Sequence, residues 1–249
     1  IGLGGFLTKN FSLGIYANYL RAEYDYSIRS AKDGDSDIFS LGITGMWKMM
    51  KDFYLRYNVY GFISSNDYNG RTGLNLELKE KASYTMKGVH GEILLGKVYR
   101  GKLNVIPEIG IRYTYYNSES FWTKVYDSAG NRVTSWDRYY DPDSKHMWKG
   151  VIGVMLASEA KAGAMPVKLY AYGRLEQAFG KNDISAVNYM RSDPTRWKLS
   201  REINRTTFIV QLGGEFRLQK NLGLEISGRG DFNGDYTSYS GSMMLRYNW

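Results

Sequence analysis

Few residues in this chain of 249 could carry out acid–base chemistry. Only two histidines are present, His90 and His146, and there is no cysteine. His90 stands two residues before Glu92, so in an extended strand both side chains project from one face and could form a base with an orienting carboxylate. The same spacing also suits a purely structural hydrogen bond. His146 has only Asp141 and Asp143 nearby, so we expect neither a metal nor a cofactor.

The composition excludes several classes of protein. A chain without cysteine has no disulfide scaffold, and 43% hydrophobic with 23% charged residues is not the composition of a disordered chain. The longest nearly uninterrupted apolar run, residues 151–157, is too short for a membrane-spanning helix. The net charge of +8 comes from scattered basic residues, so we expect no nucleic-acid partner. Aromatic residues at 15%, with 28 glycines, are unusual for a soluble domain.

Apolar and polar residues alternate in long segments, and this period of two is typical of β-strands. From Phe53 to Ile63, the odd positions are mostly apolar and the even positions mostly polar. Helical patterns are almost absent. The alternation predicts an all-β fold in one domain, residues 1–249, with strands at residues 1–8, 11–28, 37–49, 53–65, 84–99, 102–117, 147–160, 167–179, 205–218, 221–232 and 237–249.

The connections between these strands alternate in length. Tight connections are expected at residues 9–10, 50–52, 101, 161–166 and 220. Long ones, rich in glycine, asparagine, aspartate and serine, are expected at residues 30–36, 66–83, 119–146 and 180–204. Short turns at one end and long loops at the other are typical of outer-membrane barrels, in which the short turns are periplasmic and the long loops extracellular.

A soluble β-sandwich is the competing explanation of the alternation. The polar face holds many charged residues, which we expect to line a lumen: Lys48, Arg56, His90, Glu92, Glu108, Arg112, Lys168, Arg174, Glu176, Glu215, Arg217, Glu225, Arg229, Asp231 and Arg246. The apolar face places aromatic residues beside the tight turns, as in an interfacial girdle: Phe11, Trp47, Phe53, Tyr247 and Trp249. This girdle favours a transmembrane antiparallel up-and-down β-barrel.

Charges of mixed sign suit a hydrated channel through which a polypeptide can move without binding tightly to the wall. A plainer interpretation is mutual pairing, for example of Lys168 with Glu176, which would satisfy buried charge. Eleven strands are predicted, whereas such barrels normally have an even number, so we expect a twelfth strand upstream of residue 1. The chain also begins without an initiator methionine or a signal peptide, which indicates a fragment of a longer precursor.

Twelve strands about 4.8 Å apart and tilted by roughly 40° enclose a cylinder of backbone radius about 12 Å. Side chains would leave a bore on the order of 10–12 Å, which matches one α-helix or one extended hairpin. A barrel of this size would be a poor general diffusion pore.

Two regions resemble the translocator domains of autotransporters. Their central hairpin is similar to YTMKGVHGEILLG at residues 84–96 followed by LNVIPEIGIRY at residues 103–113. Their last three strands are similar to residues 208–214, 221–228 and 245–249. The C-terminal strand resembles the signal read by the barrel assembly machinery, with Ser242, Tyr247 and Trp249 in the matching positions and Met244 where a small residue is expected.

The resemblance implies a twelve-stranded outer-membrane barrel that anchors and exports an N-terminal passenger, with a linker helix in its lumen. It also implies outer-membrane lipid, the barrel assembly machinery and periplasmic chaperones as partners. Some relatives cleave the linker with acidic residues in the lumen, and Glu92 matches one such position, while Gly110 stands where the second acid lies. Otherwise we expect no enzyme activity.

Two other functions are consistent with a barrel. One is a stand-alone outer-membrane channel or adhesin, and the other is a barrel enzyme such as an omptin-like protease, which would depend on His90 and Glu92. The loop at residues 180–205 carries a net charge of +3 and could contact lipopolysaccharide phosphates. A merely solvated loop explains its charge equally well.

Overall fold

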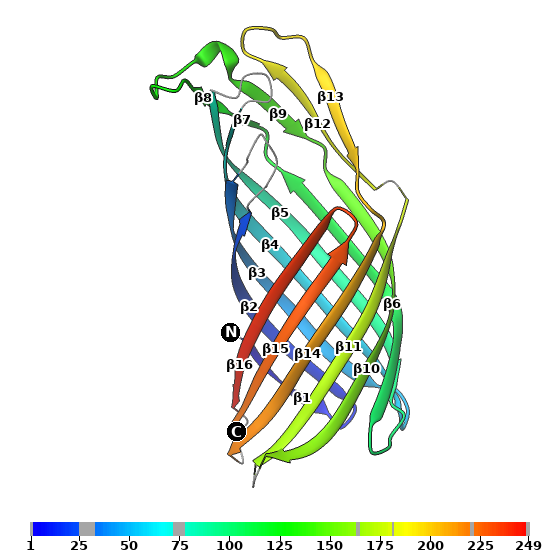
Figure 1. Ribbon diagram of the computed structural model, residues 1–249. Helices are drawn as coiled ribbons and strands as arrows, with labels where there is room; N and C mark the ends of the chain where they lie inside the picture. Colours follow the sequence, from blue (N-terminus) through cyan, green and yellow to red (C-terminus); the bar gives the residue numbers. More distant parts are fainter. Residues whose placement is uncertain are drawn as a thin grey trace.

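The computed structural model describes residues 2–24, 33–71, 78–162, 165–180, 182–219 and 222–247. Most of these residues lie in β-strands (Figure 1). The long strands are β1 (Gly2–Thr8), β2 (Phe11–Tyr24), β3 (Asp33–Lys48), β4 (Phe53–Arg71), β5 (Lys79–Lys97), β6 (Asn104–Ser118), β10 (Lys145–Ala162), β11 (Met165–Phe179), β14 (Thr206–Gln219), β15 (Leu222–Asn233) and β16 (Tyr236–Tyr247).

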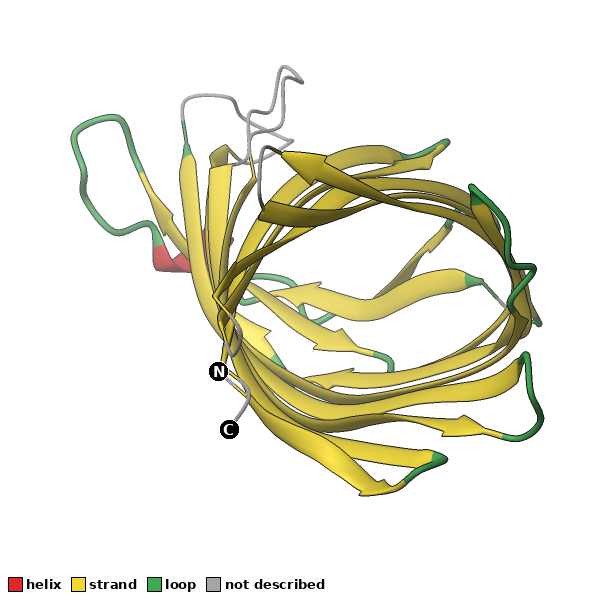
Figure 2. Ribbon diagram, turned by 90° about the horizontal axis from the view of Figure 1, so that it is seen from below, coloured by secondary structure: helices red, strands yellow, loops and turns green. Residues whose placement is uncertain are grey.

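Each long strand pairs antiparallel with the next, in the order β1-β2-β3-β4-β5-β6-β10-β11-β14-β15-β16. The sheet curls around a central axis (Figure 2). The prediction of an all-β, antiparallel up-and-down fold is confirmed. A short strand, β8 (Lys124–Tyr126), adds to β5 and is the twelfth strand of this sheet. It is not the upstream strand that the sequence predicts, and that strand stays a prediction.

Several strands extend further than the alternation indicates. The ladder between β4 and β5 continues from Ser65 opposite Thr85 to Arg71 opposite Lys79, so β4 ends six residues later and β5 begins five residues earlier than predicted. Both faces of this extension are polar, and alternation therefore no longer marks it as a strand. Residues 25–28, predicted to end the second strand, lie outside the described residues.

The connections at residues 119–146 and 180–204 are long, as predicted, but they contain strands that the sequence analysis did not predict. Within the described residues these segments form a second sheet of four strands in the order β13-β12-β9-β7. Its strands are β7 (Phe121–Trp122), β9 (Arg138–Pro142), β12 (Asp183–Met190) and β13 (Trp197–Glu202), with a short 3-10 helix, η1, at Thr134–Trp136. Contacts between rings from different strands, such as Trp122 with Tyr189 at 5.5 Å, hold this sheet together, and local alternation does not reveal such contacts.

The two faces of the large sheet have opposite character. Along β3, the apolar side chains of Phe39, Leu41 and Ile43 are exposed, whereas the intervening Ser40 is buried. The buried face is thus polar and the exposed face apolar, the reverse of a soluble protein. No helix within the described residues is long and apolar enough to cross a membrane.

Candidate functional site

The polar face carries a connected group of charged side chains from five strands, which we name the interior network. Several of its contacts join strands that are not neighbours in the sheet, which requires the concave face (Figure 2). The network consists of Arg56 on β4, Glu92 on β5, Glu108 and Arg112 on β6, Lys149 on β10, and Arg174 and Glu176 on β11.

Glu92 and Glu176 alternate with cations in the centre of the network. Arg112 Nη2 lies 2.8 Å from Glu92, and its Nη1 lies 2.7 Å from Glu176. Arg174 likewise contacts both carboxylates, with its Nε 2.9 Å from Glu176 and its Nη2 hydrogen-bonded to Glu92. Lys149 Nζ adds a third cation to Glu176 at 3.2 Å. Each carboxylate is therefore held by at least two cations.

Glu108 forms the second part of the network. Its Oε1 accepts a hydrogen bond from Tyr54 at 2.7 Å, and its Oε2 accepts one from Tyr172 at 2.8 Å. Arg56 Nη2 also lies 3.0 Å from Oε2. A fully buried carboxylate loses its hydration, and these three donors replace it.

Glycines make room for the two tyrosines. Gly96 and Gly153 are the residues directly opposite Glu108 on its two neighbouring strands. A Cβ atom at Gly96 would lie 2.3 Å from the Tyr54 ring, and one at Gly153 would lie 2.7 Å from the Tyr172 hydroxyl. The absence of these two side chains allows both phenol groups to reach the carboxylate.

The structure does not join the two groups of the proposed catalytic pair. His90 Nδ1 lies 3.1 Å from the Thr114 hydroxyl, and the His90 ring stacks on Tyr60 with centroids 4.6 Å apart. Glu92 is engaged by Arg112 and Arg174 instead. Neither the catalytic pair nor the alternative structural hydrogen bond between His90 and Glu92 is therefore present. His146 lies on β10, where its Nδ1 is 2.7 Å from the Tyr113 hydroxyl, and no metal-binding group of side chains occurs within the described residues.

The other predicted interior residues lie along the same face but outside the network. Arg229 pairs with Asp231 at 2.6 Å, and Glu225 accepts a hydrogen bond from Tyr170 at 2.8 Å. The suggested pairing of Lys168 with Glu176 is wrong, because eight residues separate them along one extended strand. The rest of the predicted set that is described lies on β3, β11 and β14, namely Lys48, Lys168, Glu215 and Arg217, and the side chain of Arg246 lies outside the described residues.

Sequence analysis missed several members of the site. Lys149 belongs to the network, although the run from Val151 to Ala157 made its strand look uniformly apolar. Tyr54 and Tyr172 were visible as polar-face positions, but their bonds to Glu108 depend on strand register. Alternation alone assigns a residue to a face and does not say which residues of more distant strands lie beside it.

The aromatic girdle is partly described. Phe11 and Trp47 face each other across β2 and β3, and the Lys97 ammonium lies 5.0 Å from the Phe53 ring. The same ammonium lies 4.7 Å from Tyr99, an exposed aromatic residue that the prediction omitted. The side chain of Tyr247 and the whole of Trp249 lie outside the described residues.

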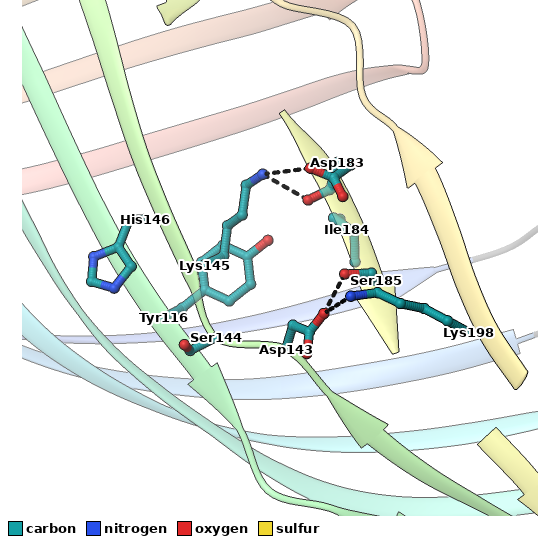
Figure 3. Close-up of a pocket in the computed structure, with 9 residues that line it drawn as sticks. All are labelled: Tyr116, Asp143, Ser144, Lys145, His146, Asp183, Ile184, Ser185 and Lys198. Carbon is teal, nitrogen blue, oxygen red and sulfur yellow. Dashed lines mark hydrogen bonds and ion pairs between the residues drawn. The ribbon is translucent and has the colours of Figure 1, made fainter. Parts of the chain in front are cut away.

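A separate polar pocket of about 440 Å³ lies between β10 and the second sheet (Figure 3). In it, Lys145 donates to the Asp183 carbonyl at 2.6 Å. Asp143 accepts from Ser185 at 2.5 Å and from Lys198 at 2.7 Å. These contacts neutralise the pocket's charges and connect the two sheets.

An exposed apolar face around a charged, internally paired interior defines an outer-membrane type of β-barrel. The sequence profile of the Autotransporter beta-domain family matches residues 1–229. The chain belongs to this family, and it is an outer-membrane translocator that exports a passenger. The channel, adhesin and protease alternatives are not favoured.

Solved structures show the same fold. The translocator domain of NalP from Neisseria meningitidis is 15% identical, with a TM-score of 0.73, and the match covers all of this chain and 77% of that one. The beta domain of Bordetella BrkA is 16% identical, with a TM-score of 0.65 over all of this chain and 88% of that one. The transport unit of AIDA-I from Escherichia coli is 16% identical, with a TM-score of 0.55, and the match covers 100% of this chain and 81% of that one. No curated protein sequence matches significantly.

Proposed function

We propose that residues 1–249 form one domain whose polar interior is the path of the passenger, and that a linker segment stays there after export. The interior network supports this path. Its three carboxylates and four cations neutralise one another almost completely, so the wall is wetted but exerts only a weak net field on a passing chain.

Neutral polar side chains on the concave face of β14, β15 and β16 support the same proposal. Ser227 on β15 and Ser242 on β16 share a hydrogen bond of 2.7 Å, and Gln211 on β14 donates to Ser227 at 3.3 Å. Neutral polar side chains can exchange hydrogen bonds with any peptide segment, whatever its sequence. A wall of this kind suits a passenger that crosses unfolded.

Single cysteines test the path, because the native chain has none. The variant Ser227→Cys places a thiol on the concave face, and Ile226→Cys places one on the outer face of the same strand. With a stalled passenger that carries one engineered cysteine, and with an added thiol oxidant, we expect disulfide crosslinking from position 227 only. Equal crosslinking from both positions, or crosslinking from position 226 alone, would contradict the proposed path.

We further propose that the second sheet lies on the extracellular side and the tight turns on the periplasmic side. All of β7, β9, β12 and β13 lie at the end of the large sheet opposite the turn between β3 and β4 (Figure 1). Ser128→Cys should react with a membrane-impermeant maleimide on intact cells. Met50→Cys, in the exposed turn, should react only after the outer membrane is permeabilised.

Assembly of the barrel requires partners. We propose that periplasmic chaperones hold the unfolded chain and that the barrel assembly machinery recognises Ser242, Tyr247 and Trp249. We assign no catalytic step, including linker self-cleavage, to this domain. In support, Glu92 is the matching acid, and the guanidinium groups of Arg112 and Arg174 both contact it. Glu92→Gln should leave the length of the exported passenger unchanged.

A further inference from the structure

Four exposed cations lie together on the outer face of β4, β5 and β8, and we name them the cationic face: Arg71, Lys79, Lys81 and Lys124. On β5, Lys79 and Lys81 share the face of Val89, which is exposed in the apolar belt. The opposite side of this segment is covered, because Glu80, Ala82 and Val125 are buried. The four cations therefore point away from the barrel.

The strand register brings like charges together on this face. Arg71 is directly opposite Lys79, and Lys81 is directly opposite Lys124. Side chains in such positions have Cβ atoms about 5 Å apart, and like charges there destabilise a sheet. None of the four cations forms a salt bridge with a described residue. Asp67, an acid on the same face, is instead hydrogen-bonded by Ser83.

Three other surface cations at this end of the molecule are neutralised. Lys198 lies 2.7 Å from Asp143, Arg201 lies 3.2 Å from Asp235, and Arg205 lies 3.2 Å from Glu202. These three belong to the loop at residues 180–205, whose net charge suggested contact with phosphates. The pairing there leaves the cationic face as the better site for an external anion.

The height of the cationic face indicates the kind of anion. Lys87 is the first cation above the exposed Val89 on the outer face of β5, and Lys81 and Lys79 follow six and eight residues further out. With a rise of about 3.3 Å per residue and a tilt near 40°, they stand about 15–20 Å further from the hydrocarbon than Lys87. A lipid with anions only at the interface would not reach them.

We propose that the cationic face binds the phosphorylated, acidic saccharide head group of a lipopolysaccharide molecule in the outer leaflet, with Lys87 near its innermost phosphate. The inference rests on the proposed extracellular position of this end of the barrel. An anionic saccharide that rises along the outer wall would neutralise both like-charge pairs at once.

The test compares two variants of the whole domain that each remove four positive charges. One is Arg71→Gln/Lys79→Gln/Lys81→Gln/Lys124→Gln, and the control replaces four salt-bridged cations by glutamine: Arg21, Lys198, Arg201 and Arg205. Binding of purified lipopolysaccharide to the refolded domain is measured by native mass spectrometry. Each cation near an anionic lipid surface strengthens binding about fivefold, so we expect at least about a tenfold rise in Kd for the first variant.

The control variant should change the Kd less than about threefold. Equal weakening of binding in both variants would overturn the proposed site, because only the overall charge would then matter. Unchanged binding in the first variant would also overturn it. If that variant does not refold, the double variants Arg71→Gln/Lys79→Gln and Lys81→Gln/Lys124→Gln provide the same comparison.

Two further probes identify the ligand. Inorganic phosphate at the phosphate concentration of the lipopolysaccharide should not displace it, and displacement would indicate a simple anion site instead. Lipid A, which lacks the outer oligosaccharide of lipopolysaccharide, should bind the first variant and the parent equally, and a full loss of its binding to the variant would overturn the assigned height. Surface display of the passenger in cells is scored separately, so failed export would contradict the proposed function without deciding the lipid site.

Discussion

Tyr54 and Tyr172 donate hydrogen bonds to opposite oxygens of the same carboxylate, that of Glu108, from strands on either side of it. Each phenol lies over a glycine that is directly opposite Glu108. Four strands, β4, β5, β6 and β10, are thereby fixed in one register, with β11 joined through Tyr172. The buried acid therefore has a structural role that its charge alone would not indicate.

Gly153→Ala tests this arrangement. The new Cβ would displace Tyr172 and break its bond to Glu108, at a cost of about 1–3 kcal/mol in the free energy of unfolding. Gly173→Ala is the matched control, because nothing lies within 4 Å of its Cβ position. Urea unfolding in lipid vesicles measures both. In a Tyr172→Ala background the cost of Gly153→Ala should largely vanish, and a cost that stays the same would show that the clash lies elsewhere.

Replacement of Glu176 should expose the repulsion within the network. Arg112 and Lys149 are directly opposite each other, and both contact Glu176. Glu176→Gln should destabilise the barrel by about 3 kcal/mol, because buried cations lose a shared partner. Adding Lys149→Met should restore part of the loss. The same unfolding measurement applies, and strictly additive effects of the two substitutions would contradict the shared contact.

A charged residue introduced on the outer face of β3 should destabilise the barrel. Ile43 is exposed on the apolar face, about midway between Trp47 and the polar end, and the adjacent Thr44 is on the opposite face. Ile43→Arg should destabilise the barrel in vesicles by about 2–4 kcal/mol, as is typical for arginine at the bilayer midplane. Thr44→Arg should have a much smaller effect. A larger loss at position 44 would mean that the two faces are reversed.

Acid should loosen the second sheet. Hydrogen bonds from Lys198 and then Ser185 hold the pKa of Asp143 below its ordinary value of 3.8. A lowered folded-state pKa means that the stabilisation is present above pH 3.8 and is lost as the pH falls through the lowered value. The protection factors of amides in β12 and β13, that is their exchange rates corrected for the intrinsic pH dependence, should therefore fall below about pH 4. Asp143→Asn should exchange faster at pH 7 and lose this acid dependence.

The sequence predicts the large sheet well because lipid and water impose opposite requirements on the two faces of every strand, as Phe39 to Ile43 illustrate. The sequence predicts strands poorly where lipid and water do not impose different residue types on the two faces. The extension from Ser65 to Arg71 is polar on both faces, and the second sheet depends on rings, such as Trp122 and Tyr189, that meet only after folding. Most network residues were predicted, but their partners depend on register, so Lys168 was paired wrongly and Lys149 was missed.

The distribution of the ion pairs has a mechanical consequence. On the proposed path, a passenger that folds outside the cell would pull on its linker, and friction inside the bore would transmit that load to the wall as shear along the strands. Strands β4, β5, β6, β10 and β11 are linked by guanidinium groups and by phenols that lie over glycines, so neighbouring strands cannot slide without breaking several contacts together. This part of the barrel wall would therefore stay rigid while the passenger exerts force on the domain.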